Sequence, residues 1–164
     1  MHSLYFVLLT KDKDEKFDSE GARHRADSTL GENGFAGTEG YFSSSKADWY
    51  VIGGRWTGTL TEALGKKPTK DKEYMKSEAK KLKGYGWKAD SIKDHIKANT
   101  RNPYNGGGYE DDAMVLTNVL IRNLKKQFSA EEIFDAEECE EVTVSGLDEK
   151  KDVGKIIVVV DYHM

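Results

Sequence analysis

The chain has 164 residues, of which 37% are hydrophobic and 33% charged, with a net charge of −4 and a sequence pI of about 5.6. Three Trp, eight Tyr and six Phe supply bulky core side chains, so the composition excludes wholesale disorder. The acidic balance argues against a general nucleic-acid binder, and a single cysteine excludes an internal disulfide.

The first predicted element is a buried strand over residues 3–10, a near-continuous apolar run. The run is too short for a signal-peptide core, and no apolar run approaches the length of a membrane span. We therefore expect a cytoplasmic protein with no membrane partner. The lone cysteine, Cys139, fits a reducing compartment, and we expect a small buried residue there rather than a reactive thiol.

A helix is predicted to follow, with Asp18 or Ser19 as its cap. It carries one narrow apolar stripe at a spacing of four residues, formed by Ala22, Ala26 and Leu30. The Gly- and Ser-rich residues 31–47 are predicted to form a loop.

Residues 49–52 (Trp-Tyr-Val-Ile) have strong strand preference, and residues 55–60 could resume as a second strand. Gly53 and Gly54 between them are compatible with a tight two-residue hairpin turn or with a bulge.

Residues 62–110 are interpreted as a Lys-rich helical insertion in a single domain of residues 1–164, because they hold too few apolar residues for a core of their own. Helices are expected over 71–83 and after Asp90. From Glu62 to Arg101 there are 12 Lys and Arg against 6 Asp and Glu. This basic segment fits either an acidic partner, such as a host protein or a nucleic acid, or a merely solvated helical face.

Residues 112–128 carry the strongest helical pattern, with Asp111 or Asp112 as the expected cap. Val115 and Val119 lie nearly opposite the main apolar face, so this helix is expected to be covered on two sides. The second cover would be the insertion or a second subunit, which makes a homodimer through these two valines a candidate assembly.

The last third of the chain predicts a short helix after the capping-box pattern at 129–132 and a strand over 140–145. Residues 155–162 are β-branched and apolar, as expected of a central strand. The charged loop between Gly146 and Gly154 is predicted to join these two strands as a hairpin. The element order predicts an α+β fold, specifically a ferredoxin-like two-layer sandwich with a mainly antiparallel sheet.

The densest cluster of uncommon residues runs from Asp48 to Trp56. Arg55 offers a planar fork for a carboxylate or phosphate, and Trp49 and Trp56 offer stacking surfaces. A purely structural role is the alternative: the glycines as a turn, the tryptophans as core, and Arg55 paired with Asp48 or Asp111.

The stretch Asp48-Trp49-Tyr50-Val51-Ile52-Gly53-Gly54-Arg55-Trp56-Thr57-Gly58 resembles a motif of uncharacterised bacterial and phage-encoded proteins, Asp-aromatic-x-x-Gly-Gly-Arg-Trp-Ser/Thr-Gly. The resemblance extends to residues 19–23, residues 111–113 and the ending 160–163. It implies a phage-linked setting and no particular chemistry.

Two further candidate sites are acidic. Asp161 and His163 are two apart in a strand and therefore face one side, where they could form an acid–base pair or half of a metal site. Asp111 and Asp112 follow a triple glycine at the expected helix start, where they would repel phosphate and attract a cation or Arg55. Two ligands are too few to infer a metal, and no nucleotide, zinc or hydrolase motif implies a cofactor.

Three functions remain open from sequence, one of which is a dimeric α+β domain without catalysis that uses Val115 and Val119 at its interface. Another is a non-enzymatic, phage- or mobile-element-linked interaction protein that binds a host protein or nucleic acid. The alternative to both is a small-molecule-binding protein or small enzyme with a pocket around Arg55, Trp56, Asp161 and His163.

Overall fold

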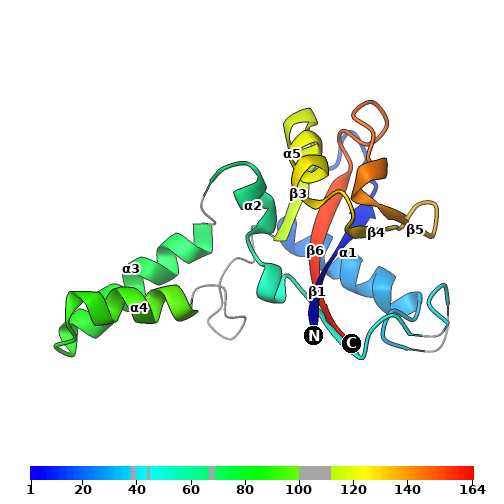
Figure 1. Cartoon of the computed structure of the whole chain (residues 1–164). Coiled ribbons are helices and arrows are strands. Elements are labelled where there is room, and N and C mark those ends of the chain that lie inside the picture. Colours follow the sequence, from blue (N-terminus) through cyan, green and yellow to red (C-terminus); the bar gives the residue numbers. More distant parts are fainter. Residues whose placement is uncertain (38–39, 44, 67–68, 100–111) are drawn as a thin grey trace.

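The computed structural model describes residues 1–37, 40–43, 45–66, 69–99 and 112–164. In this part of the chain, a six-stranded sheet has the order β2-β6-β1-β4-β5, and β3 also pairs with β6 (Figure 1). Its strands are β1 (His2–Leu9), β2 (Trp49–Ile52), β3 (Ala113–Val115), β4 (Glu132–Asp135), β5 (Glu140–Thr143) and β6 (Ile156–His163). The pairs are antiparallel except for β1 with β4, which is parallel. The predicted α+β class is thus confirmed.

The centre of the sheet is formed by β1 and β6, which pair along their whole length. Both are almost entirely buried, as expected of continuous apolar strands that are covered on both faces. The two predicted strands over 3–10 and 155–162 are therefore confirmed, and the second is the neighbour of the first rather than of residues 140–145.

Helices cover both faces of the sheet. On one face, α1 (Ser19–Glu32) packs its predicted alanine and leucine stripe against Tyr5 and Val7 of β1. On the other, α5 (Asn118–Phe128) and α2 (Thr59–Ala63) pack against Leu4 and Phe6. The predicted two-layer sandwich is therefore wrong, because alternate residues of the central strands are apolar on both sides. The ferredoxin-like arrangement is not confirmed.

The edge of the sheet next to β6 is built from two separate strands in line. Ile52 of β2 is opposite Val160, and Ala113 of β3 is opposite Val158. Between these positions the amide of Gly53 donates to the carbonyl of Val159, 2.7 Å away. The chain thus leaves one strand position at Gly53 and re-enters it at Ala113. The predicted strand over 55–60 is wrong: these residues form the 3₁₀ turn η1 (Gly54–Trp56) and the start of α2.

Two helices of the lysine-rich segment pair with each other, α3 (Thr69–Gly84) and α4 (Ala89–Asn99). Figure 1 shows them as a helical hairpin that extends away from the sheet. Leu82 and Ile96 are buried in this hairpin, at 5% and 8% exposure. The helices predicted over 71–83 and after Asp90 are confirmed.

The helix predicted over 112–128 begins later than expected. Residues Ala113–Val115 form β3, and Thr117 caps α5 by accepting a hydrogen bond from the amide of Leu120 at 3.2 Å. Val115 packs on the core beside α1, whereas Val119 on α5 is 55% exposed. The two valines therefore do not share a helix face, and the reasoning that placed both at a dimer interface is wrong.

The C-terminal third also differs in its pairing. Residues 132–135 form β4 instead of a short helix, because Ile133 and Phe134 are drawn into the core beside β1. The strand predicted over 140–145 is present as β5, but it pairs with β4 and not with β6. The hairpin predicted across Gly146–Gly154 is therefore wrong. Cys139, expected to be buried, is exposed.

A partly buried polar cluster ties the loop after α1 to the far edge of the sheet. The ammonium of Lys46 lies 2.7 Å from Glu132 and 3.2 Å from Glu141. The hydroxyl of Tyr5, fully buried, donates to Glu141 at 2.8 Å. Burial lowers the pKa of Lys46, but the two carboxylates outweigh it and raise that pKa overall. The cluster fixes this loop across the ends of three separate elements.

Candidate functional site

The candidate site lies where the first residues of β1 and β2 meet the end of β6. In the strand register, His163 is directly opposite His2 on one side and opposite Trp49 on the other. Residues paired in this way point to the same face of a sheet. Asp161 lies two residues before His163 and therefore on that face as well. Four polar or aromatic side chains from both ends of the chain thus converge.

The centre of the cluster is Asp161, which is only 1% exposed. Its carboxylate lies 2.9 and 3.1 Å from Nδ1 of His2, through its two oxygens, and accepts the backbone N–H of Arg55 at 2.9 Å. A buried carboxylate is costly unless it is hydrogen-bonded, and these contacts supply that stabilisation. Because a carboxylate accepts only, it favours the His2 tautomer with the proton on Nδ1 and leaves Nε2 as the basic nitrogen.

The aromatic rings form a compact triad. Trp49 stacks on His163 at 5.3 Å between centroids and 3° between planes. His2 meets both rings edge-on, at 5.2 Å from Trp49 and 5.5 Å from His163. The indole can stabilise a protonated His163 through its π face. Trp49 remains 43% exposed, so the triad borders solvent.

The second imidazole also has a carboxylate nearby. Nδ1 of His163 lies 3.7 Å from Oδ2 of Asp48, whose side chain is 73% exposed. This ion pair is longer and more solvated than the contact between His2 and Asp161, so its electrostatic effect is weaker. The two histidines are therefore electrostatically unequal: one rests on a buried carboxylate and the other on an exposed one.

The Gly-Gly pair explains how Arg55 reaches Asp161. Gly53 and Gly54 have φ of +76° and +55°, a conformation that L side chains rarely adopt. A Cβ on Gly54 would lie 2.7 Å from Asp161, and one on Gly53 would overlap the carboxylate of Asp112. The two glycines thus let the backbone turn closely over two buried carboxylates. Gly53 precedes the 3₁₀ turn η1 and Gly54 begins it, so the pair forms neither of the two predicted arrangements, a hairpin turn or a bulge.

Asp112 sits on the other side of this turn at 1% exposure. Its Oδ1 accepts a hydrogen bond from the hydroxyl of Thr57 at 2.9 Å. The sequence indicated that Asp112 was a candidate helix cap or a partner for a cation or for Arg55. Instead, it lies just before β3 and holds the turn that follows Gly53.

The structure brings together only some of the predicted site residues. Four of them converge: Asp48, Trp49, Asp161 and His163. Arg55 is an exposed residue and joins them only through its backbone amide. Trp56 instead packs on the core beneath α5, and its buried indole Nε1 has no hydrogen-bond partner among the described residues. Asp111 lies outside the described residues.

The sequence patterns did not indicate His2 as a site residue. A histidine at the start of an apolar strand carries no motif, and its partner is 159 residues away. The signal that could have found it is strand pairing. If residues 3–10 and 155–162 are antiparallel neighbours, their outer ends place His2 beside Asp161 and His163.

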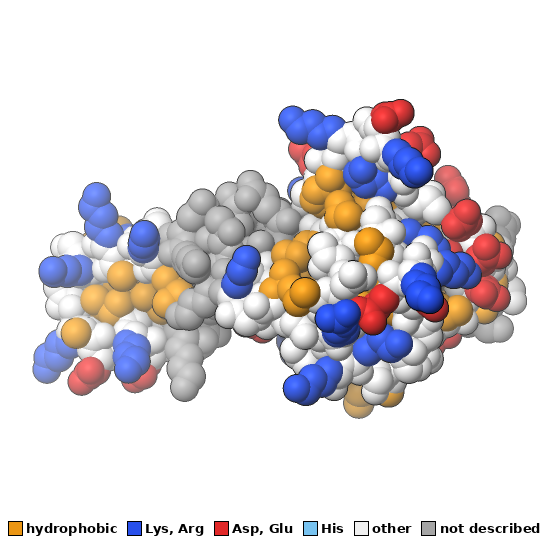
Figure 2. All heavy atoms as spheres, turned by 90° about the horizontal axis from the view of Figure 1, so that it is seen from above, with side chains coloured by type: hydrophobic (Ala, Val, Ile, Leu, Met, Phe, Trp, Pro, Cys, Tyr) orange, Lys and Arg blue, Asp and Glu red, His pale blue; other side chains and the backbone are white. Residues whose placement is uncertain are grey.

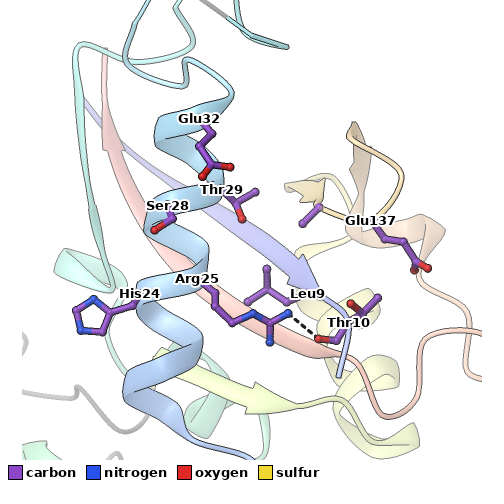
Figure 3. A pocket seen from close by; sticks show the side chains of 9 residues that line it. Leu9, Thr10, His24, Arg25, Ser28, Thr29, Glu32 and Glu137 are labelled. Atoms are coloured by element: carbon purple, nitrogen blue, oxygen red, sulfur yellow. Dashed lines mark hydrogen bonds between the residues drawn. The ribbon is translucent and has the colours of Figure 1, made fainter. Parts of the chain in front are cut away.

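A pocket of about 450 Å³ lies at the other end of the strands from the candidate site, between α1, the end of β1 and the residues after β4 (Figure 3). Arg25 points into it but already donates to the carbonyl of Thr10 at 2.9 Å and pairs with Glu15 at 3.8 Å. Because its cation is engaged within the chain, the pocket offers less for ligand binding than its volume suggests.

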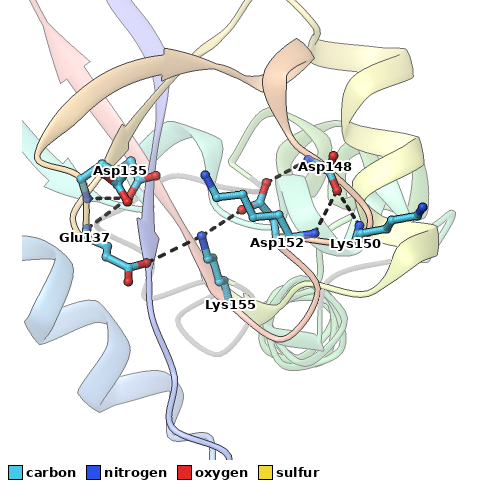
Figure 4. Close-up of polar contacts among 8 residues, drawn as sticks. Asp135, Glu137, Asp148, Lys150, Asp152 and Lys155 are labelled. Atoms are coloured by element: carbon cyan, nitrogen blue, oxygen red, sulfur yellow. Dashed lines mark hydrogen bonds and ion pairs between the residues drawn. The ribbon is translucent and has the colours of Figure 1, made fainter.

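In a charged network beside this pocket, the side chains are paired with one another and with backbone amides (Figure 4). Lys155 pairs with Asp152 at 3.0 Å and with Glu137 at 3.8 Å. Asp148 accepts the backbone N–H groups of Lys151 and Lys150, which lower its pKa. These contacts close the loop before β6, so we assign the network a structural role.

In comparisons with known proteins, no family model, curated protein or solved structure matches the chain. A proposed function therefore depends on the arrangement of its own residues. Within the described residues, every helix is too short or too polar to cross a membrane. Those residues also contain no group of three or more His, Cys, Asp or Glu side chains placed to hold a metal ion.

Proposed function

We propose that the protein is a small acid–base enzyme whose reaction takes place at His2 and His163. The observation that carries the proposal is the contact of 2.9 Å between Nδ1 of His2 and the buried carboxylate of Asp161. A carboxylate on one ring nitrogen fixes the tautomer and stabilises the imidazolium that forms when the other nitrogen takes a proton. His2 is therefore the candidate general base.

Ester cleavage also needs a proton donor for the leaving oxygen, and the imidazole of His163 is the candidate. His163 lies 5.5 Å from His2 between ring centroids; its ring stacks on Trp49, and its Nδ1 lies 3.7 Å from a carboxylate oxygen of Asp48. A base and an acid at this separation can serve the two sides of one ester linkage. The substrate class that fits is a carboxylic or phosphoric ester small enough to contact both rings.

In the proposed step, Nε2 of His2 removes a proton from water or from a hydroxyl of the substrate. The oxygen of that water or hydroxyl forms a bond to the carbonyl carbon or phosphorus. The bond from that atom to the leaving oxygen breaks, and protonated His163 gives its proton to that oxygen. Each proton transfer of this kind contributes roughly 10²- to 10⁴-fold to a rate.

The test uses two chromogenic probes, p-nitrophenyl acetate and bis(p-nitrophenyl) phosphate, with the full chain. We expect turnover of one of them to fall by at least about 10²-fold in His2→Gln and by less in His163→Gln, because p-nitrophenolate leaves readily without being protonated. His24→Gln is the matched control, because His24 is exposed on α1. Equal turnover in all three variants, or no turnover by the wild type, would refute the proposal.

A second candidate function is partner binding through the basic segment of residues 62–101. Between Met75 and Ile96 the structure describes six lysines, all exposed, against three acidic residues. The resemblance to phage-encoded proteins supports a mobile-element setting for such a partner, either a host protein or a nucleic acid. Loss of binding to an acidic partner on raising the salt concentration would support it.

A further inference from the structure

The α3–α4 turn, defined as the end of α3 together with the residues that join it to α4 (Lys80–Lys88), has an unusual surface composition. Four of its nine residues are lysines, none is acidic, and all four lysines are exposed. Two aromatic residues alternate with glycines at its tip: Tyr85 is 70% exposed and Trp87 is 43% exposed. Figure 2 shows the lobe that carries α3 and α4 with Lys and Arg side chains and some Asp and Glu side chains along its margin, and hydrophobic side chains between them.

The backbone of this α3–α4 turn is held in one conformation. Gly86 has φ of +83°, the amide of Trp87 donates to the carbonyl of Leu82, and the amide of Gly86 donates to that of Lys83. These two bonds form the Schellman arrangement that ends a helix. Leu82 is buried between the helices and anchors the turn. The two aromatic residues are thus presented by an ordered backbone.

The ring of Trp87 is also oriented by its neighbours. It meets His95 edge-on at 5.5 Å, and His95 in turn lies 3.4 Å from Glu78. Trp87 remains 43% exposed beside this contact, so part of its side chain is open to solvent. Since ring and backbone are both fixed, binding a flat group there would cost little side-chain ordering.

A solvated lysine face explains the charges but not two open aromatic rings beside them. Cations that neutralise phosphates, combined with rings on which bases stack, are the chemistry of single-stranded nucleic-acid binding. A duplex hides the faces of its bases, and an acidic protein surface would use the lysines without needing flat rings. Both features together therefore favour a single strand.

We propose that the α3–α4 turn binds single-stranded nucleic acid, with Tyr85 and Trp87 stacking on bases and the lysines contacting phosphates. The proposal deepens the second candidate function by naming the partner, and it is independent of the acid–base site. The overall charge of −4 does not oppose it, because the charge that matters lies within a Debye length of the strand.

The experiment measures fluorescence anisotropy of labelled dT₁₂ and rU₁₂ with the full chain between low and moderate salt. A duplex of equal length and a polyglutamate peptide of equal charge are the comparison ligands. We expect the single strands to bind more tightly than either, with a log–log salt slope of about −2 to −3 if three to four phosphates are contacted.

Two variants separate the contributions. The triple variant Lys80→Gln, Lys81→Gln and Lys83→Gln should flatten the salt slope by about 2. Trp87→Leu should weaken binding by about tenfold and leave the slope unchanged, because stacking releases no counterions. The matched control replaces three exposed lysines elsewhere with Gln: Lys126, Lys150 and Lys151.

Three results would overturn the inference: equal effects of the two triple variants, tighter binding of the duplex, or tighter binding of polyglutamate. Preference for polyglutamate that depends on Lys80, Lys81 and Lys83 would retain the second candidate function with a protein partner. If the wild-type chain binds none of these ligands at low salt, both the inference and the second candidate function are refuted.

Discussion

Nδ1 of His2 lies 2.9 Å from Oδ1 of Asp161, across 159 residues of sequence. The contact exists because β1 and β6 are antiparallel neighbours and their outer ends coincide. It is completed by the amide of Arg55, which the Gly53-Gly54 turn brings to the other oxygen of the same carboxylate. Three segments far apart in the chain thus build one buried acceptor.

The two carboxylates of the site should differ in their effect on turnover. Asp161 is buried and in direct contact with His2, whereas Asp48 is exposed and 3.7 Å from His163. With the chromogenic probes, we expect Asp161→Asn to lower turnover by roughly 10²- to 10⁴-fold and Asp48→Asn by less than about tenfold. A larger effect of Asp48→Asn would reverse the assignment of base and acid.

Gly54→Ala should destabilise the fold and disturb the site. The residue has φ of +55°, and its new Cβ would lie 2.6 Å from Val51 and 2.7 Å from Asp161. We expect the free energy of unfolding in urea to fall by at least about 2 kcal/mol.

The matched control for this change is Gly84→Ala, at the end of α3, where a Cβ meets nothing within 4 Å. It should leave stability unchanged or raise it by up to about 1 kcal/mol. If Gly54→Ala were tolerated equally well, close approach of the backbone to Asp161 would not be what requires glycine.

Stability should decline above pH 10. Burial raises the pKa of Tyr5 far above its ordinary value of 10.0, and its bond to Glu141 adds to the effect; burial also raises the pKa of Tyr50 to about 12. A tyrosine whose pKa is higher in the folded state than in the unfolded state contributes its full stabilisation below the unfolded-state pKa. That stabilisation is lost as the pH rises above the unfolded-state pKa.

Tyr5→Phe isolates this effect. At pH 7 it should cost about 1–2 kcal/mol, because Glu141 loses one of its donors, but the decline between pH 10 and 12 should become shallower. Urea unfolding at pH 8, 10 and 11 measures both. An equally steep decline in the variant would show that Tyr5 is not its source.

Thr117→Ala should lower the free energy of unfolding by about 1 kcal/mol, because the hydroxyl accepts the amide of Leu120 at the start of α5. Thr117→Ser retains the acceptor and should stay within a few tenths of a kcal/mol of the wild type. Identical stabilities for the Ala and Ser variants would mean that this cap does not stabilise the helix.

Local patterns predicted those elements whose own residues decide their structure. The alanine stripe of α1, its cap at Asp18 and the buried runs of β1 and β6 were readable in this way. Residues 113–116 were not, because Ala-Met-Val-Leu suits a helix as well as a strand, and only pairing with β6 decides between them.

The candidate site was half predictable for the same reason. Asp161 and His163 share a strand, so their common face follows from local periodicity. Trp49 and His2 join them only through non-local pairing with β6. Arg55 was singled out for its guanidinium, yet its contact with Asp161 is made by the backbone, which no side-chain pattern reveals.

The central claim is that Asp161 holds His2 in the tautomer of a general base. Long-range ¹H–¹⁵N spectra of the histidine side chains, at a pH where the imidazoles are neutral, test it directly in the wild type and in Asp161→Asn. We expect the proton of His2 on Nδ1 in the wild type and on Nε2 in the variant, where the amide group of the asparagine donates to Nδ1. The same tautomer in both proteins, or a proton on Nε2 in the wild type, would contradict the claim.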